Sequence, residues 1–567
     1  MSTQTTRPLV GHGAYFATLL ILSSICATST WSRAQTTLLR FDPLPEGASR
    51  NRVPVAGLGD LDGDGFSEIG IGRASIADFR GQVRIHCGRS GALIASLDGD
   101  AGLRGSFGFS IARLDDLDRD GVDDFAIGAP VHPVGGVPVG MARVFSGRTR
   151  QTIADVFGDG EGDLFGSVIA AVGDVDRDGI DDFVVGAPEN GAPIGHYGPG
   201  YAKLFSGRTR TMLRKIQGTN VADEFGSSLA PAGDVDGDGR ADFLVGSLLE
   251  SRPGATGQGS ARIYAGSDGR VLRDFYAEAG SDHFGVAVAA VGDVDADGVG
   301  DHAIGAISMV NPLPGKVFVY SGADGQSLGV VVGPPGSGVF GLRIAAGRDV
   351  DQDGHDDFWV ADPMDSGSGA PLGAVHLVSG RSLSIQRTLR GPNPGSGFGS
   401  TLETVEDLDF DGLPELTIGV PTVRSIRGAI SARLDVVSSA PQLSTFGSGC
   451  STTQVPRLDA TSPRLGSSWL FFLSSRPVAV PGALMLSLKP NLPTMLPTGC
   501  VLYTDSGSSV PALGFVTDAA GRWFGSIALP AVAALEGLEL ATQGMVVATA
   551  GLQLYDLSNG VYATLRP

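Results

Sequence analysis

Short runs of hydrophobic residues, separated by polar turns, predict β-strands along most of the chain. A clear example has apolar runs at Phe165–Val172, Phe183–Gly186, Tyr201–Ser206 and Met212–Ile216, each bounded by Gly, Pro or Asp turns. Such runs between turn residues are typical of strands. Four short strands that follow one another in this way predict one antiparallel sheet.

The four-strand unit recurs at a fixed period. An Asp-rich stretch, DxDxDGxx(D/E), precedes the second strand of each unit, and its first aspartates lie at positions 60, 116, 174, 234, 293, 349 and 407, which are 56 to 60 residues apart. A period of this length indicates a repeat architecture. Seven such sheets arranged radially, each covering its faces with its neighbours, form a propeller. We therefore predict an all-β protein with a seven-bladed β-propeller at residues 35–440.

The two ends of this region are expected to meet in one blade. The seventh unit has no convincing fourth strand after Arg433–Val437, whereas Thr36–Phe41 resembles the fourth strands Thr152–Phe157 and Val271–Tyr276. We expect Thr36–Phe41 to complete blade seven. This closure would tie the ring together and remove exposed sheet edges.

A Phe-Gly pair has the same phase in six units, nine residues before the first aspartate. These phenylalanines are expected to pack in the core, and they are Phe107, Phe165, Phe225, Phe284, Phe340 and Phe398. The first unit has Asn51-Arg52 at this place. Its opening strand should therefore be irregular.

The segments on either side of the repeats differ in character. Residues 1–34 have the pattern of a secretory signal: Arg7 in a polar start, an apolar run from Ala14 to Ala27 and small residues at Ser32 and Ala34. That run is shorter than the ~18 apolar residues of a membrane-spanning helix, so we expect export to the outside of the cell or to its surface.

The period stops near residue 444. Residues 445–567 keep short apolar runs between Pro and Gly turns, which predicts a small C-terminal β-sandwich. Its apolar stretch from Ile527 to Ala550 contains Glu536 and Glu539, which argues against a membrane span. Attachment to a surface, export sorting and binding all remain open as its role.

Three cysteines follow the signal segment. Cys450 and Cys500 either pair as a disulfide in an oxidising compartment, leaving Cys87 alone, or all three are buried free thiols. Both interpretations stay open at this point.

Composition and charge narrow the function classes. The chain has 85 Gly, 33 Pro and 42% hydrophobic residues, which fits a turn-rich folded protein rather than a disordered one. A formal net charge of −20 argues against nucleic acid and anionic membrane surfaces as partners. Four carboxylates in each of seven loops make 28 of the 61 acidic residues, so seven divalent cations would bring −20 to −6.

The Asp-rich stretches have the spacing of a cation loop. Side chains at positions 1, 3 and 5 alternate so that their oxygens converge, Gly at position 6 reverses the chain, position 7 offers its carbonyl, and a carboxylate at position 9 closes the shell. All-oxygen shells of this kind favour calcium over zinc or copper. We expect up to seven calcium ions, held in chain order by Asp60, Asp62, Asp64 and Glu68; Asp116, Asp118, Asp120 and Asp124; Asp174, Asp176, Asp178 and Asp182; Asp234, Asp236, Asp238 and Asp242; Asp293, Asp295, Asp297 and Asp301; Asp349, Asp351, Asp353 and Asp357; and Asp407, Asp409, Asp411 and Glu415.

Three alternative loop types fit this spacing less well. An EF-hand needs Glu at position 12 and flanking helices, but β-branched strand residues stand there, for example Val185 and Ile304. Dockerin loops come as two copies followed by helices. Plain turns without a metal ion would leave four carboxylates repelling one another in every loop.

The Phe-Gly pairs, the cation loop and Gly-Ala-Pro at Gly128–Pro130 and Gly186–Pro188 together resemble the FG-GAP repeats of the integrin α-subunit propeller. The resemblance covers roughly residues 36–440. It implies a seven-bladed ring, calcium loops between the first and second strands of blades, and extracellular adhesion or ligand binding. The chain departs from integrins because all seven units carry the loop and because nothing in it resembles the integrin legs, transmembrane helix or cytoplasmic tail.

An extracellular protein or glycan is the expected partner. In an up-and-down blade the loops alternate between two faces, so the second-to-third and inter-blade loops lie opposite the cation loops. Variable loops on a rigid scaffold are the usual place for recognition, and the candidates are Val131–Gly140, Glu189–Gly200 with His196 and Tyr197, Leu248–Ser260 with Glu250 and Arg252, and Met364–Leu372.

A secreted polysaccharide hydrolase or lyase is the alternative. The sequence has no HExxH, GxSxG or phosphate-loop motif, and we expect no catalytic residues. Buried acids or a histidine cluster on the face opposite the cation loops would favour the enzyme.

Overall fold

The structure is a computed structural model. It describes residues 37–44, residues 53–437 apart from short breaks (76–78, 190–196, 252–256, 277–282, 309–312, 368–370, 394, 409–411 and 425–429), and strands of the segment 443–564. All of the described elements are β-strands. In the described part of the chain, no helix has the length and hydrophobicity that a membrane crossing requires. The expected signal, residues 1–34, lies outside the described residues.

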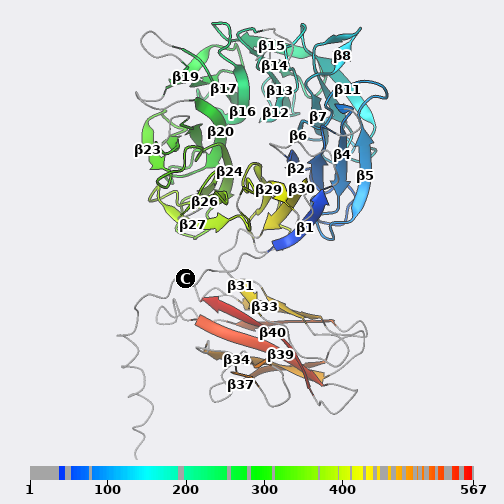
Figure 1. Ribbon diagram of the computed structural model, residues 1–567, viewed down its shortest axis with the longest axis vertical. Coiled ribbons are helices and arrows are strands. Elements are labelled where there is room, and N and C mark those ends of the chain that lie inside the picture. The colour runs from blue at the N-terminus through cyan, green and yellow to red at the C-terminus, as the bar shows by residue number, and fades with distance from the viewer. Residues whose placement is uncertain are drawn as a thin grey trace, which may run out of the picture. The chain divides into compact units, whose positions relative to one another are not determined.

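Seven four-stranded antiparallel sheets are arranged around one axis as a ring, which confirms the seven-bladed propeller (Figure 1). Blades one to three contain β2 (Val55–Gly57), β3 (Ile69–Gly72), β4 (Gln82–His86) and β5 (Leu93–Asp98); β6 (Ser110–Arg113), β7 (Phe125–Ala129), β10 (Met141–Phe145) and β11 (Thr152–Phe157); and β12 (Val168–Gly173), β13 (Asp182–Ala187), β14 (Tyr201–Phe205) and β15 (Met212–Gln217). Blades four to six contain β16 (Phe225–Gly233), β17 (Asp242–Ser247), β18 (Ser260–Tyr264) and β19 (Val271–Phe275); β20 (Phe284–Gly292), β21 (Asp301–Ala306), β22 (Lys316–Tyr320) and β23 (Ser327–Val332); and β24 (Arg343–Arg348), β25 (Asp357–Asp362), β26 (Ala374–Val378) and β27 (Ile385–Arg390).

Blade seven closes the ring as predicted. It contains β28 (Leu402–Val405), β29 (Glu415–Arg424) and β30 (Ile430–Val437), and β1 (Thr37–Leu44) pairs with β30 as its outer strand. In the register, Arg40 lies opposite Asp435 and Phe41 opposite Leu434. Figure 1 shows the blue strand β1 beside the yellow strand β30, so the first and last strands of the propeller share one sheet.

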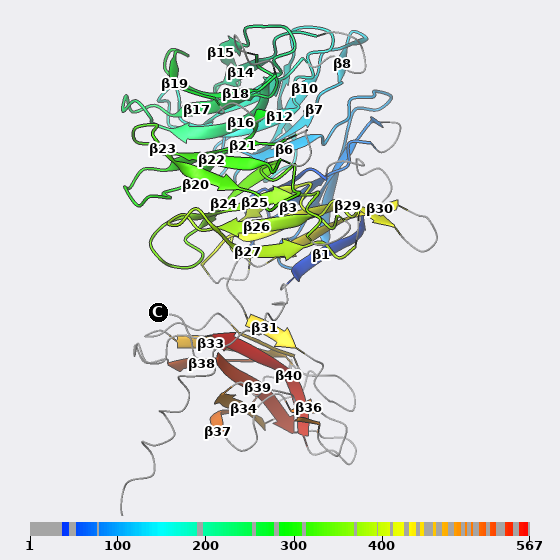
Figure 2. The same ribbon diagram turned by 60° about the vertical axis from the view of Figure 1, so that its left-hand side comes forward.

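Burial follows the place of each strand in its blade. The second strands β7, β13, β17, β21 and β25 are buried along their whole length. Neighbouring blades cover both of their faces, and the strand residues are therefore largely apolar, with a buried carboxylate at the start of β13, β17, β21 and β25. The fourth strands at the rim are largely exposed, as β15 shows. Figure 2 shows the blades stacked against one another.

The residues of the FG-GAP pattern pack where two neighbouring blades meet, and we call this contact a blade joint. All six predicted phenylalanines are buried, with at most 1% exposure. The glycine of Gly-Ala-Pro in one blade lies against the glycine of Phe-Gly in the next: a Cβ on Gly128 would lie 2.0 Å from the carbonyl oxygen of Gly166, and a Cβ on Gly186 would lie 2.2 Å from that of Gly226. Only glycine allows this approach of two backbones. In the first unit, the irregular opening strand is the three-residue β2.

The segment after the ring forms its own sheets. A five-stranded sheet has the order β31 (Leu443–Phe446), β40 (Tyr555–Thr564), β39 (Glu539–Val547), β34 (Pro481–Leu488) and β37 (Val510–Val516), and a three-stranded sheet has β32 (Arg457–Ala460), β33 (Ser468–Ser474) and β38 (Arg522–Ala528). Two short pairs complete the strands, β35 (Thr494–Met495) with β36 (Val501–Leu502), and β8 (Pro133–Val134) with β9 (Val137–Pro138) inside blade two. The β-sandwich of residues 445–567 remains a prediction. Cys450 and Cys500 lie outside the described residues, and Cys87 is a buried free thiol.

Candidate metal centre

Each Asp-rich loop joins the first strand of a blade to the second, and its own backbone orients its carboxylates. In loop three, Asp174 accepts hydrogen bonds from the amides of Asp178 (3.1 Å) and Gly179 (2.8 Å), and Asp176 accepts one from Asp178 (3.1 Å). The amide of Ile180 donates to Asp178 (3.0 Å). Such side chain to backbone bonds hold short acidic residues in tight turns. The lone pairs that these bonds leave free are available to a cation.

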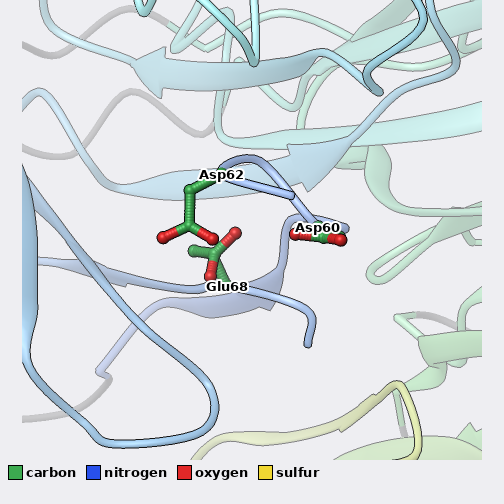
Figure 3. A group of neighbouring side chains, drawn as sticks. All are labelled: Asp60, Asp62 and Glu68. Carbon is green, nitrogen blue, oxygen red and sulfur yellow. The ribbon is translucent and has the colours of Figure 1, made fainter. Parts of the chain in front are cut away.

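The spacing predicted that positions 1, 3, 5 and 9 converge, and in loops one to four the converging group consists of positions 1, 3 and 9, without position 5. In loops one to four, one oxygen from each of these three residues lies within 4.8 Å of the others. In loop five, the converging group consists of positions 1, 3 and 5, which are Asp293, Asp295 and Asp297. Figure 3 shows the group of loop one, Asp60, Asp62 and Glu68. In loop seven, Asp409 and Asp411 lie outside the described residues, and Asp407 accepts from the amide of Gly412 (2.7 Å).

Position 9 has a second role that the sequence spacing did not indicate. In loop three, one oxygen of Asp182 accepts the amide of Val175 (2.8 Å), and the other accepts the amide of Gly207 in the turn between the third and fourth strands (2.8 Å). The same pair of bonds is made by Asp124, Asp242, Asp301 and Asp357. The residue at position 9 therefore links the cation loop to the neighbouring turn of its blade.

Burial makes the carboxyl at position 9 hard to ionise without a cation. These residues are at most 1% exposed. Loss of solvation raises the pKa of Asp182 to about 6 and the pKa values of Asp124 and Asp357 to about 7, while the backbone amides lower them in part. A cation beside the carboxylate would favour its ionised form.

Loop one, which like loop seven has glutamate at position 9, tests whether a cation fits. Its position 9 is Glu68, which is fully buried and has a pKa that burial and the nearby aspartates raise to about 7. One oxygen of Glu68 accepts the amide of Leu61 (2.6 Å), but the other, Oε1, has no hydrogen-bond partner. A buried, unpartnered carboxylate oxygen among three further carboxylates fits a divalent cation, since such ions take oxygen ligands.

Positions 3 and 5 are partly engaged by arginine. The guanidinium of Arg208 lies 2.9 Å from a carboxylate oxygen of Asp178, that of Arg148 lies 3.5 Å from Asp120, and that of Arg270 lies 2.5 Å from Asp236. These arginines come from the turns between the third and fourth strands. They neutralise part of the negative charge of the loops.

The face opposite the cation loops carries the loops predicted for recognition. Val131–Gly140 forms the hairpin β8–β9, and the exposed side chain of Tyr197 belongs to Glu189–Gly200, whose residues 190–196, with His196, lie outside the described part. Arg252 also lies outside it. Glu250 is buried inside its blade: it is 7% exposed, and its carboxylate lies 2.6 Å from the guanidinium of Arg262.

Buried titratable groups gather in blade six, at a place that the sequence did not lead us to expect. Asp362, Asp365 and His376 are at most 1% exposed, and Asp365 lies 3.0 Å from Arg390. The sequence contained a signal for this group, because Ala-Asp-Pro at 361–363 stands where units two and three have Gly-Ala-Pro. These groups lie under the face opposite the cation loops, where buried acids were expected to favour the hydrolase or lyase.

The buried imidazole predicts an acid-sensitive contribution to stability. Burial lowers the pKa of His376 to about 4, whereas an unfolded histidine has its usual value near 6.5. Between these two pKa values the histidine is protonated in the unfolded chain but neutral in the folded chain. The free energy of unfolding therefore falls as the pH drops from about 6.5 to 4, by up to ~3 kcal/mol. Asp362 acts in the opposite direction, because burial raises its pKa to about 6.

The His376→Phe variant isolates the histidine. Phe318 occupies the same register in blade five, opposite Ile304 as His376 is opposite Val360. Denaturant unfolding of both proteins at pH 7 and pH 4.5 should show the variant gaining stability relative to the natural protein at the lower pH. A difference in unfolding free energy that is equal at both pH values would contradict the assignment.

Seven radial four-stranded sheets, blade joints made of paired glycines and an acidic loop before each second strand define an FG-GAP type of β-propeller. Residues 165–205 and 225–264 match the family model described as FG-GAP repeat. The chain is 31% identical to integrin alpha-5 of Xenopus laevis over 205 residues, which are 34% of this chain and 19% of that protein. It is 29% identical to integrin alpha-IIb of Homo sapiens over 281 residues, 48% of this chain and 21% of that protein.

Among solved structures, one described as "Structure of Dos1 propeller" aligns with a TM-score of 0.40 and 12% identity, over 69% of this chain and 78% of that one. The chain spans about a fifth of the length of these two integrin chains. The region that it shares with them is the propeller, and this protein carries an integrin-α-like FG-GAP propeller. Its acidic clusters are compatible with divalent cations.

Proposed function

We propose that this protein is an exported propeller that calcium stabilises and that binds an extracellular protein or glycan. Residues 1–34 direct export, residues 35–440 form the propeller, and residues 445–567 form a separate C-terminal domain. The ligand binds to the loops opposite the cation loops. The similarity to integrin α chains supports a binding or adhesion module.

The observation that carries this proposal is the uneven distribution of exposed apolar side chains between the two faces. In the described part of the ring, seven large apolar side chains are exposed on the second-to-third and inter-blade loops, namely Phe79, Val134, Val137, Tyr197, Val221, Leu313 and Met364. Among the described residues of the cation loops, only Val299 is exposed in this way. These side chains come from the loops of several blades, and exposed apolar surface that favours one face over the other supports that face as the interaction site.

Calcium, up to seven ions, is proposed for the loops because their ligands are carboxylate oxygens without His or Cys in the predicted sets. Asp or Glu at positions 1, 3, 5 and 9 of each loop would hold the ion. Bound calcium would supply the positive charge that offsets carboxylate repulsion. In this proposal the calcium loops stabilise the propeller, and the opposite face binds the ligand.

The ligand face is tested with an array of matrix proteins and glycans in millimolar calcium. We expect a ligand on the array, and we expect the double variant Tyr197→Ser, Met364→Ser to lose most of the binding. The matched control Val299→Ser changes the same kind of exposed side chain on the other face and should bind normally. Equal binding by all three proteins would overturn the proposed face, and release of a cleaved glycan would favour the hydrolase or lyase.

A further inference from the structure

Two neighbouring cation loops, loops three and four, are hydrogen-bonded directly to each other. The amide of Ala241, at position 8 of loop four, donates to the carbonyl oxygen of Asp174, at position 1 of loop three (3.2 Å). The guanidinium of Arg240 donates to the carbonyl oxygen of Val175 (2.6 Å). In return, Arg177 of loop three donates to the carbonyl oxygen of Gly239 (3.1 Å). Three bonds therefore connect the residues that position the two sets of carboxylates.

Loops five and six repeat this arrangement with different side chains. The amide of Asp356, again at position 8, donates to the carbonyl oxygen of Asp293, again at position 1 (2.9 Å). Nδ1 of His355 lies 2.8 Å from the carbonyl oxygen of Val294, where only an N–H can be the donor. The amide of Asp293 also donates to the carboxylate of Asp356 (3.0 Å). The shared feature is thus a backbone bond from position 8 to position 1, with a side-chain bond from position 7 to position 2.

The residue before position 1 explains why these two junctions are close. It is Gly173 in loop three and Gly292 in loop five, both with positive φ. A Cβ on Gly173 would lie 2.8 Å from the side chain of Ala241, and a Cβ on Gly292 would lie 2.1 Å from a carboxylate oxygen of Asp356. The corresponding Gly233 of loop four has nothing within 4 Å of that position.

Other junctions lack this connection. Among the residues that the structure describes, no backbone bond from position 8 to position 1 joins loop three to loop two, or loop five to loop four. Loop seven has Pro414 at position 8, which has no N–H to donate. The contacts between adjacent cation loops therefore differ from one junction to the next.

From these contacts we infer that loops three and four, and likewise loops five and six, bind their cations as two coupled pairs. The inference rests on the proposed cation binding. An ion in loop four fixes positions 7 and 8 of that loop, and these hold the backbone of positions 1 and 2 in loop three, where the first ligand of the other ion originates. Coupling of this kind is reciprocal, so each loop of a pair raises the affinity of the other, by about tenfold.

The test is a calcium titration of the metal-stripped full chain, followed by hydrogen exchange with mass spectrometry, which reads each loop separately. The variant Asp236→Asn disables loop four. The calcium midpoint for protection of residues 174–182 in loop three should then rise about tenfold. The control Asp118→Asn changes the same position of loop two, which has no such bond to loop three, and should leave that midpoint unchanged.

A second pair of variants removes the connection and keeps all carboxylates. Arg240→Ala removes a side-chain donor, and Ala241→Pro removes the backbone donor in the way that Pro414 does naturally. In either background, adding Asp236→Asn should shift the midpoint of loop three much less than it does in the natural protein. All variants are first compared by melting in saturating calcium, so that a misfolded variant is recognised, and Arg240→Ala serves alone if the proline is not tolerated.

The outcomes separate the two proposals. An unchanged loop-three midpoint in Asp236→Asn, with normal calcium protection of the other loops, would overturn the coupling alone. An equal shift of loops two and three would also overturn it, because that would indicate a general loss of stability. If no loop gains protection with calcium, the proposed cation binding itself is wrong.

Discussion

Removing calcium is expected to lower the melting temperature of the propeller by on the order of 10 °C or more. For a loop with a dissociation constant of about 0.1 mM in roughly millimolar calcium, binding contributes about 1.4 kcal/mol. Seven filled loops would contribute ~10 kcal/mol, and for a large domain each kcal/mol moves the melting temperature by a degree or more. Without the ions, the converging carboxylates also repel one another.

Circular dichroism melting in calcium and in excess EDTA measures this effect. Adding calcium back beyond the chelator should restore the original curve, which separates ion removal from irreversible damage. An unchanged melting curve in EDTA would be incompatible with calcium in these loops.

The second large effect is expected from Gly186→Ala, a single methyl group at a blade joint. A Cβ on Gly186 would lie 2.2 Å from the carbonyl oxygen of Gly226 in the next blade and 2.6 Å from the side chain of Val168. The first contact is with backbone, which cannot move away without separating the two blades. Overpacking of this kind costs ~1–3 kcal/mol, and a rigid backbone contact belongs at the upper end.

Gly160→Ala is the matched control for this substitution. Its Cβ would meet only a side-chain oxygen of Asp163, at an ordinary 3.5 Å. Denaturant unfolding in saturating calcium should therefore show a large loss of stability for Gly186→Ala and little change for Gly160→Ala. Similar stability of the two variants would contradict the view of FG-GAP as a packing joint between blades.

Much of the fold followed from the sequence because the same local pattern is repeated seven times. The strand runs, the cation loop and the buried phenylalanines each recur at a fixed place in the period. A strand or loop that is weakly marked in one unit can therefore be assigned from the other units. Closure by β1 was also predictable, because the seventh unit lacked a fourth strand and the strand at Thr36–Phe41 preceded the first unit. The spacing likewise predicted the convergence of Asp174, Asp176 and Asp182.

Contacts between segments that are distant in the sequence could not be predicted from residue spacing. The amide bonds of Asp182 reach a turn 25 residues away, and the bond between Arg240 and Val175 connects two blades. Glu250 was expected in a recognition loop, yet its pairing with Arg262 buries it. The contacts of Asp182 and Glu250 depend on how the strands of one blade pack, and the bond between Arg240 and Val175 depends on which loops become neighbours when the ring closes. Residue spacing along one unit carries neither kind of information.

The central claim is that the repeated acidic loops are calcium sites, and anomalous diffraction tests it most directly. Crystals grown in millimolar calcium, measured at a wavelength where calcium scatters anomalously, should show one peak inside each loop, among the carboxylates at positions 1, 3, 5 and 9, for example Asp174, Asp176, Asp178 and Asp182. The absence of peaks from all of the loops under these conditions would contradict calcium binding by the propeller.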